Sequence, residues 1–206
     1  MAYSDILRHD LRHESRGRRL RARYERCRTP TIRKVIDQLP NAECRLAVAL
    51  ARFAGLRCPS EISLLKWSEI NWHEGRMLVH APKTKRKGKP TRIVPLFPEL
   101  RPFLEDAFEA AADGAVQCVK YSSDGIRHHL KRAIDSAGVE RWEKLFVNLR
   151  SSRQTELVQA GFPAHVVCEW LGNTTTVANK HYLQVNDADF AAALELPADP
   201  TVEVAR

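Results

Sequence analysis

Hydrophobic residues in the first half of the chain recur at helical spacing. Leu46, Leu50 and Phe53 repeat within residues 41–54, and Gly55 follows where a glycine commonly ends a helix. The pattern therefore predicts a helix over 41–54. By the same criteria, helices are predicted from Thr29 onward and over 60–67, 98–112, 123–136, 149–160, 163–171, 174–183 and 187–196.

The period changes near the middle of the chain. Residues 76–80 and 91–95 are short β-prone runs, and a polar, glycine-containing loop separates them. This order is typical of a β-hairpin. The predicted fold class is mainly α with a small β-hairpin or three-stranded sheet.

Composition indicates a single sizeable domain that meets a polyanion. The chain has 206 residues, of which 44% are hydrophobic, which is enough to build a real core. The formal net charge is +8. A protein this basic commonly binds nucleic acid.

The positive charge is concentrated in two segments. Residues 1–30 carry nine arginines against four acidic residues, and residues 76–92 carry seven basic residues and no acidic one. Each run is either a solvated face or a nucleic-acid contact. The second segment contains a run that we call the basic loop: Lys85, Arg86, Lys87 and Lys89. We expect the basic loop and Arg92 to bind DNA.

Cysteine spacing and hydrophobic runs limit the other classes. The five cysteines include no pair at CxxC spacing, so neither a disulfide framework nor a zinc site is indicated. No apolar run is long enough to cross a membrane, and no signal peptide is recognisable. We expect a cytoplasmic protein without metal or other cofactor.

Short motifs in a fixed order carry the candidate chemistry. They are Gly55-Leu56-Arg57 with Glu61, Lys83 at the start of the loop, Asn148-Leu149-Arg150, Leu171-Gly172-Asn173, and His181-Tyr182. Position 173 lies twenty-three residues after Arg150 and nine before Tyr182. In order and spacing, this pattern resembles the tyrosine recombinases of the phage integrase family.

The resemblance implies a site-specific DNA recombinase. Arg57 and Arg150 would grip the phosphate oxygens, with Asn173 as a further hydrogen-bonding group. Lys83, or alternatively Lys85, would protonate the leaving oxygen. Tyr182 would be the nucleophile that forms a 3′-phosphotyrosine without metal or ATP. The resemblance also implies that the protein binds double-stranded DNA and assembles on it as a homo-tetramer. It would then be associated with the nucleoid.

Each of these residues also has a plain structural interpretation. Arg57 follows a helix end and could balance the helix dipole, and Glu61 could pair with it and buttress it. Arg150 could be a surface residue on its helix. Tyr182 could be an aromatic residue of the core.

The sequence departs from the family pattern at two positions. Val147 stands where the family has the histidine of H-x-x-R, and Asn173 stands where it has the histidine of L-G-H. Neither residue can act as an acid or a base at neutral pH. Three other functions therefore stay open: a non-catalytic DNA-binding module, a topoisomerase with the same chemistry, and a helical interaction protein.

The resemblance also suggests how the chain is divided. Residues 1–28 form a basic arm or linker, 29–196 the recombinase-like domain, and 197–206 a tail. The arm is too short to fold as a separate DNA-binding domain. The chain is therefore a fragment, a truncated gene product, or a minimal enzyme whose arginine-rich arm replaces that domain. Residues 187–196 would dock on a neighbouring protomer or pack on their own domain.

Overall fold

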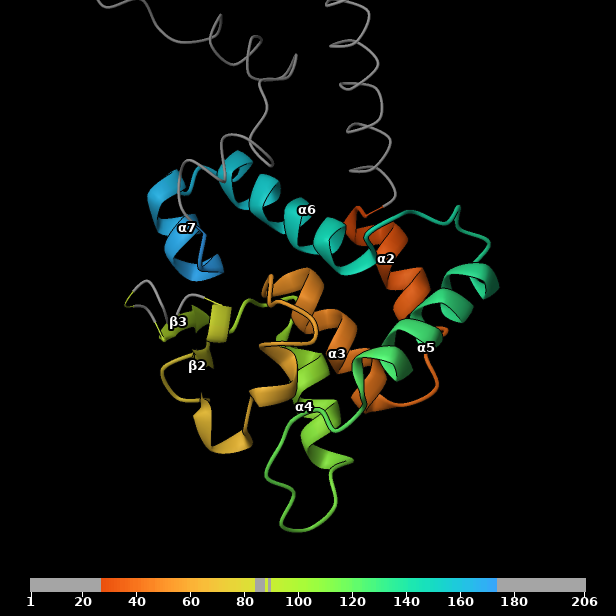
Figure 1. Cartoon of the computed structure of the whole chain (residues 1–206), viewed down its shortest axis with the longest axis horizontal. Coiled ribbons are helices and arrows are strands. Elements are labelled where there is room, and N and C mark those ends of the chain that lie inside the picture. Colours follow the sequence, from red (N-terminus) through yellow and green to blue (C-terminus); the bar gives the residue numbers. More distant parts are fainter. Residues whose placement is uncertain (1–26, 84–87, 89, 174–206) are drawn as a thin grey trace, which may run out of the picture.

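Helices surround a central helix, and a small sheet lies at one side of the molecule (Figure 1). The computed structural model describes residues 27–83, 88 and 90–173. Its helices are α2 (Thr29–Ile36), α3 (Ala42–Phe53), α4 (Arg101–Glu109), α5 (Ser123–Ser136), α6 (Leu145–Gln159) and α7 (Ala164–Leu171). Its strands are β1 (Ile70–Asn71), β2 (Arg76–His80) and β3 (Thr91–Pro95). The predicted fold class is confirmed.

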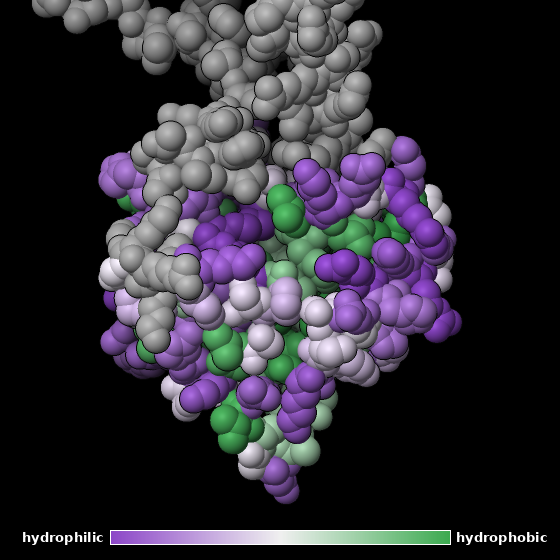
Figure 2. All heavy atoms as spheres, in the orientation of Figure 1, coloured by the Kyte–Doolittle hydropathy of each residue, from purple (hydrophilic) through white to green (hydrophobic). Residues whose placement is uncertain are grey.

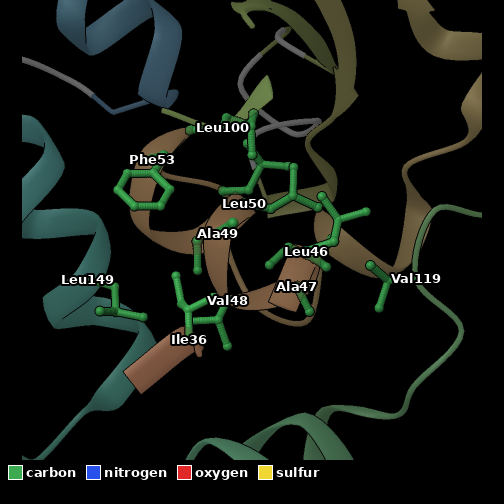
Figure 3. Packing of buried hydrophobic residues seen from close by; sticks show 14 of the residues in the cluster. Ile36, Leu46, Ala47, Val48, Ala49, Leu50, Phe53, Leu100, Val119 and Leu149 are labelled. Carbon is green, nitrogen blue, oxygen red and sulfur yellow. The ribbon is translucent and has the colours of Figure 1, made fainter. Parts of the chain in front are cut away.

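Helix α3 is the centre of the hydrophobic core. Ten of its twelve residues are buried, and it packs against α4, α5 and α6. Figure 3 shows Leu50 and Phe53 of α3 among the buried side chains, with Leu100 before α4 and Leu149 of α6 nearby. A helix buried on almost every side needs apolar residues around its whole circumference, and α3 has them. The helix predicted over 41–54 is confirmed.

The sheet is antiparallel, in the order β1-β2-β3. In the hairpin, Arg76 pairs with Pro95 and His80 pairs with Thr91. Side chains alternate along the strands, so that Met77 of β2 faces the core. The predicted hairpin is confirmed, and β3 packs against α7. This contact brings the hairpin next to the helix that precedes Asn173.

The helix predicted over 60–67 is wrong. The segment instead forms two 3₁₀ helices, η1 (Ile62–Leu64) and η2 (Trp67–Glu69). Between them Leu65 is extended, and its carbonyl accepts a hydrogen bond from the Cys118 N–H at 2.9 Å. The Trp67 N–H donates to the Val116 carbonyl at 3.0 Å. Backbone groups that pair with a distant segment cannot also form an α-helix, so tertiary contacts override the local pattern.

Helix boundaries are otherwise close to those predicted. Helix α5 has the predicted bounds, whereas α6 begins four residues early, at Leu145, after Lys144 in the left-handed region (φ 48°). Val147 therefore lies within α6, one turn before Arg150.

The predicted helices over 174–183 and 187–196 and most of the arm lie outside the described residues. Among the described helices, none has the length and apolar character needed to cross a membrane.

Candidate active site

The turn after α3 places Arg57 next to α7. Gly55 ends α3 with φ 64°, a conformation that glycine adopts without strain. A Cβ atom at Gly55 would lie 3.0 Å from Cγ of Leu171 in α7. A side chain at this position would therefore press on the Leu171 side chain, which would have to shift to make room. Glycine is required both for the turn and for the close approach of α7.

Glu61 is the buried acceptor around which the site is built. It is 1% exposed, and it accepts from the Arg57 backbone N–H at 2.8 Å and from the Arg57 guanidinium. The Arg92 guanidinium binds the same carboxylate through two parallel hydrogen bonds of 2.8 and 2.7 Å. Burial by itself raises the pKa of Glu61, but the hydrogen bonds and charge of Arg92, with help from Arg57, outweigh it and lower the pKa. Glu61 is therefore a carboxylate at neutral pH.

Arg150 reaches the same place from α6. Its side chain is 7% exposed, and one guanidinium nitrogen lies 3.9 Å from Glu61. The guanidinium also donates to the Gly55 carbonyl, to the Leu171 carbonyl and to Oδ1 of Asn173. Arg150 thus contacts four groups, two from residues 55–61 and two from residues 171–173. It is not a surface residue.

The C-terminal end of α7 supplies one carbonyl to each of the three arginines. Arg92 binds the Trp170 carbonyl at 2.7 Å, Arg150 binds that of Leu171, and Arg57 binds that of Gly172. The last carbonyls of a helix have no partner inside it and carry partial negative charge, so they suit guanidinium groups. Gly172 closes the helix in the left-handed region, at φ 70°.

The resulting cluster is positively charged. Three guanidinium groups surround one carboxylate, which leaves two formal positive charges. Arg57 and Arg150 are 93 positions apart in the sequence, yet both contact the α7 end. Such a cluster can bind an anion with two non-bridging oxygens, such as a phosphodiester.

Asn173 follows directly after the α7 end. Its oxygen accepts from Arg150, and its nitrogen donates to Oε1 of Gln154 at 2.6 Å. The structure therefore brings together three of the predicted catalytic residues, Arg57, Arg150 and Asn173. Lys83 is described and exposed, beyond β2 in the turn that leads to the basic loop. Tyr182 and the basic loop lie outside the described residues.

A sequence model described as "Phage integrase family" matches residues 28–189. This chain belongs to the phage integrase family. The match spans every motif of the candidate site, from Arg57 to Tyr182. No curated protein matches the chain.

Solved structures of integrases and recombinases share this family member's fold. XerA recombinase superposes with a TM-score of 0.63 at 19% identity, covering 78% of this chain and 59% of that chain. The Tn1549 transposon integrase in complex with circular intermediate DNA gives 0.61 at 12%, covering 82% and 64%. The catalytic domain of bacteriophage HP1 integrase gives 0.56 at 19%, covering 81% and 91%. The chain spans less than two thirds of the length of the first recombinases that it matches.

The predicted DNA contact of Arg92 does not agree with the burial of this residue in the structure. Its side chain is 4% exposed and is bound to Glu61 and to the Trp170 carbonyl. Arg92 lies on the face of β3 that also buries Val94, because side chains of a strand alternate. That alternation could have predicted its burial from the sequence. The structure thus gives Arg92 a place behind the site, where it holds Glu61.

Two other polar side chains of α6, those of Arg153 and Gln154, are also internal. Arg153 is 6% exposed in its side chain, pairs with Glu99 at 3.1 Å and stacks over the Phe97 ring at 4.2 Å. Gln154, one turn after Arg150, is fully buried. The sequence interpretation missed Gln154, although its i,i+4 spacing from Arg150 places both on one helix face.

Helix α5 contributes an exposed basic face that the sequence interpretation also missed. The exposed side chains recur at helical spacing: Arg127, His128, Lys131 and Arg132. Burial raises the pKa of the Cys58 thiol to about 12, and the charge of Arg127 opposes this rise. The positive charge of Arg127 therefore acts on the residue next to Arg57. Figure 2 shows hydrophilic side chains interspersed with hydrophobic ones on the face in view.

Proposed function

We propose that this protein is a site-specific DNA recombinase that forms a 3′-phosphotyrosine through Tyr182. The observation that carries the proposal is the convergence of Arg57 and Arg150 on the α7 end, beside Asn173. A phosphodiester in transfer gains charge on its non-bridging oxygens. Fixed guanidinium groups stabilise that charge because they need no reorganisation when it develops.

The proposed chemistry is a transesterification. The Tyr182 oxygen forms a bond to phosphorus and releases its proton to water, and the bond from phosphorus to the DNA 5′-oxygen breaks. Lys83, or Lys85 in its place, gives a proton to that departing oxygen. The phosphotyrosine keeps the bond energy, so a second DNA 5′-hydroxyl can reverse the step. The steps need neither metal nor ATP.

Arg57 can bind a phosphate while it also contacts Glu61 and the α7 end. Within the described residues its guanidinium donates to Glu61 and to the Gly172 carbonyl. A guanidinium has five N–H donors, so these bonds leave donors for a phosphate. The Arg57 side chain is also 20% exposed, compared with 7% for Arg150 and 4% for Arg92. A phosphate would therefore meet Arg57 first.

The proposed partner is double-stranded DNA. The basic loop and the exposed face of α5 would bind its phosphates, and strand exchange would need a homo-tetramer on two DNA sites. Residues 187–196 would dock on a neighbouring protomer or on their own domain. The protein would work at the nucleoid.

A DNA-binding module without catalysis is the second candidate, and Val147 favours it. Val147 is 48% exposed on α6, one turn before Arg150, and its side chain has no polar atom. It can neither donate to a phosphate nor transfer a proton. This candidate predicts salt-sensitive DNA binding without a covalent product.

A nicked suicide duplex separates the two candidates. The duplex is drawn from the DNA that flanks the gene, and the wild-type protein and Tyr182→Phe are each incubated with it. A protein–DNA band on a denaturing gel, seen with the wild type and absent with Tyr182→Phe, supports the recombinase. A gel shift with both proteins and a covalent band with neither supports the DNA-binding module.

A further inference from the structure

We infer that Gln154 is a positioning residue that fixes the orientation of the Asn173 amide for phosphate binding. This inference rests on the proposed function, and it adds a residue of α6 to the site. Gln154 is fully buried and lies one turn after Arg150. Its Oε1 accepts from Nδ2 of Asn173 at 2.6 Å.

The orientation of each amide follows from its neighbour. The Arg150 guanidinium has no acceptor, so Asn173 must turn its oxygen toward it. The Asn173 nitrogen then faces Gln154, which must present its own oxygen. The Gln154 nitrogen is left facing Cys168, with Sγ at 4.0 Å. The Arg150 guanidinium, which can only donate, thus sets the orientation of both amides, first that of Asn173 and then that of Gln154.

A flipped Asn173 would lose both bonds. Its nitrogen would face the donors of Arg150, and its oxygen would face Oε1 of Gln154. The held orientation uses one N–H of the Asn173 amide for Gln154 and leaves the second N–H as the group that can donate to a phosphate oxygen. Without the Gln154 acceptor, only Arg150 would restrain the amide, and its nitrogen could swing away.

The matched substitution is Gln154→Met, which keeps the size of the side chain and removes the acceptor. In single-turnover reactions at saturating DNA, we expect covalent adduct formation to slow about tenfold, the loss typical of one hydrogen bond. The dissociation constant for DNA should stay unchanged. Gln154→Glu keeps an oxygen at the acceptor position and should restore most of the rate. Gln38→Met, at an exposed position after α2, is the control and should leave the rate unchanged.

A double-mutant cycle tests whether Gln154 acts through Asn173. If it does, Gln154→Met with Asn173→Ala should be no slower than Asn173→Ala alone. A residue that only fills the core would slow both backgrounds by the same factor, and that result would overturn the inference. Equal rates for Gln154→Met and the wild type would also overturn it.

Hydrogen exchange of the Asn173 side-chain amide, followed by NMR, gives a readout that needs no cleavage. We expect exchange to speed up about tenfold or more in Gln154→Met and to stay slow in Gln154→Glu. Unchanged exchange in Gln154→Met would overturn the inference. If the wild type formed no adduct, the proposed function would fail, and the exchange rates would still decide whether Gln154 holds Asn173.

Discussion

Replacing Glu61 with glutamine should destabilise the protein strongly, because Glu61 compensates three buried or half-buried arginines. Its carboxylate is 1% exposed and accepts from Arg57 and Arg92, with Arg150 at 3.9 Å. Breaking a buried ion pair by removing one partner typically costs about 3–5 kcal/mol. Glutamine keeps one acceptor oxygen, so we expect a loss of about 3 kcal/mol in the free energy of unfolding. For a chain of this length, this corresponds to a fall in Tm of about 6–12 °C.

The stability that Glu61 contributes should depend on pH. The folded pKa of Glu61 is lowered, so its contribution to stability is fully present above the unfolded pKa of about 4.3. That contribution is lost as the pH falls through the lower folded pKa. The difference between the wild type and Glu61→Gln should therefore be large at pH 7 and should shrink as the pH falls below about 4.3.

Urea unfolding followed by circular dichroism, at a series of pH values, measures both effects. Glu105→Gln is the control, because Glu105 pairs with Arg101 on the surface of α4 and both side chains are half exposed. Exposed pairs contribute about 0–1 kcal/mol, so this variant should stay close to the wild type. A Glu61→Gln variant within about 1 kcal/mol of the wild type at pH 7 would refute the reasoning, since an uncompensated cluster cannot cost so little.

Three further changes test other parts of the account. Arg150→Lys should slow adduct formation about a hundredfold, because an ammonium group cannot reproduce the contacts of the guanidinium. A single-turnover rate equal to that of the wild type would contradict this. Glutamine at the four basic-loop positions should flatten the salt dependence of DNA affinity by up to about 0.9 in log–log slope per residue, and an unchanged slope would remove the loop from the DNA contact. Gly55→Ala should lower the free energy of unfolding by about 2–3 kcal/mol, because the added Cβ meets Leu171. Gly138 has the same φ of 64° but lies in open space, so Gly138→Ala should lower it by only about 1 kcal/mol. Equal losses on urea unfolding would show that the contact with Leu171 is unimportant.

Much of the fold could be predicted from hydrophobic periodicity. Helices with a regular apolar face, such as the one over 123–136, have the predicted bounds, and the hairpin was recognisable from its two β-prone runs. The segment 60–67 could not be predicted in the same way. Its backbone is shaped by pairing with residues 116–118, which are distant in the sequence.

The candidate site was predictable in its residues and less so in its arrangement. Motif spacing found Arg57, Arg150 and Asn173, because the family pattern fixes their order. Because Arg92 is charged, the sequence interpretation predicted that it contacts DNA. Instead its side chain lies on the buried face of β3, where it neutralises the buried carboxylate of Glu61. Gln154 carries no charge and belongs to no motif quoted above. Its spacing from Arg150 predicts a shared helix face, but only the structure reveals its hydrogen bond with Asn173.

The central claim is that a phosphotyrosine forms at Tyr182 in a reaction supported by the arginine cluster. Peptide mapping by mass spectrometry of the adduct on the suicide duplex, formed in the presence of EDTA, tests it most directly. The account predicts that the 3′-phosphoryl nucleotide is attached to the peptide that contains Tyr182, and that Arg57→Ala gives no adduct. An adduct on another residue, or bound DNA without any adduct from the wild-type protein, would contradict the account.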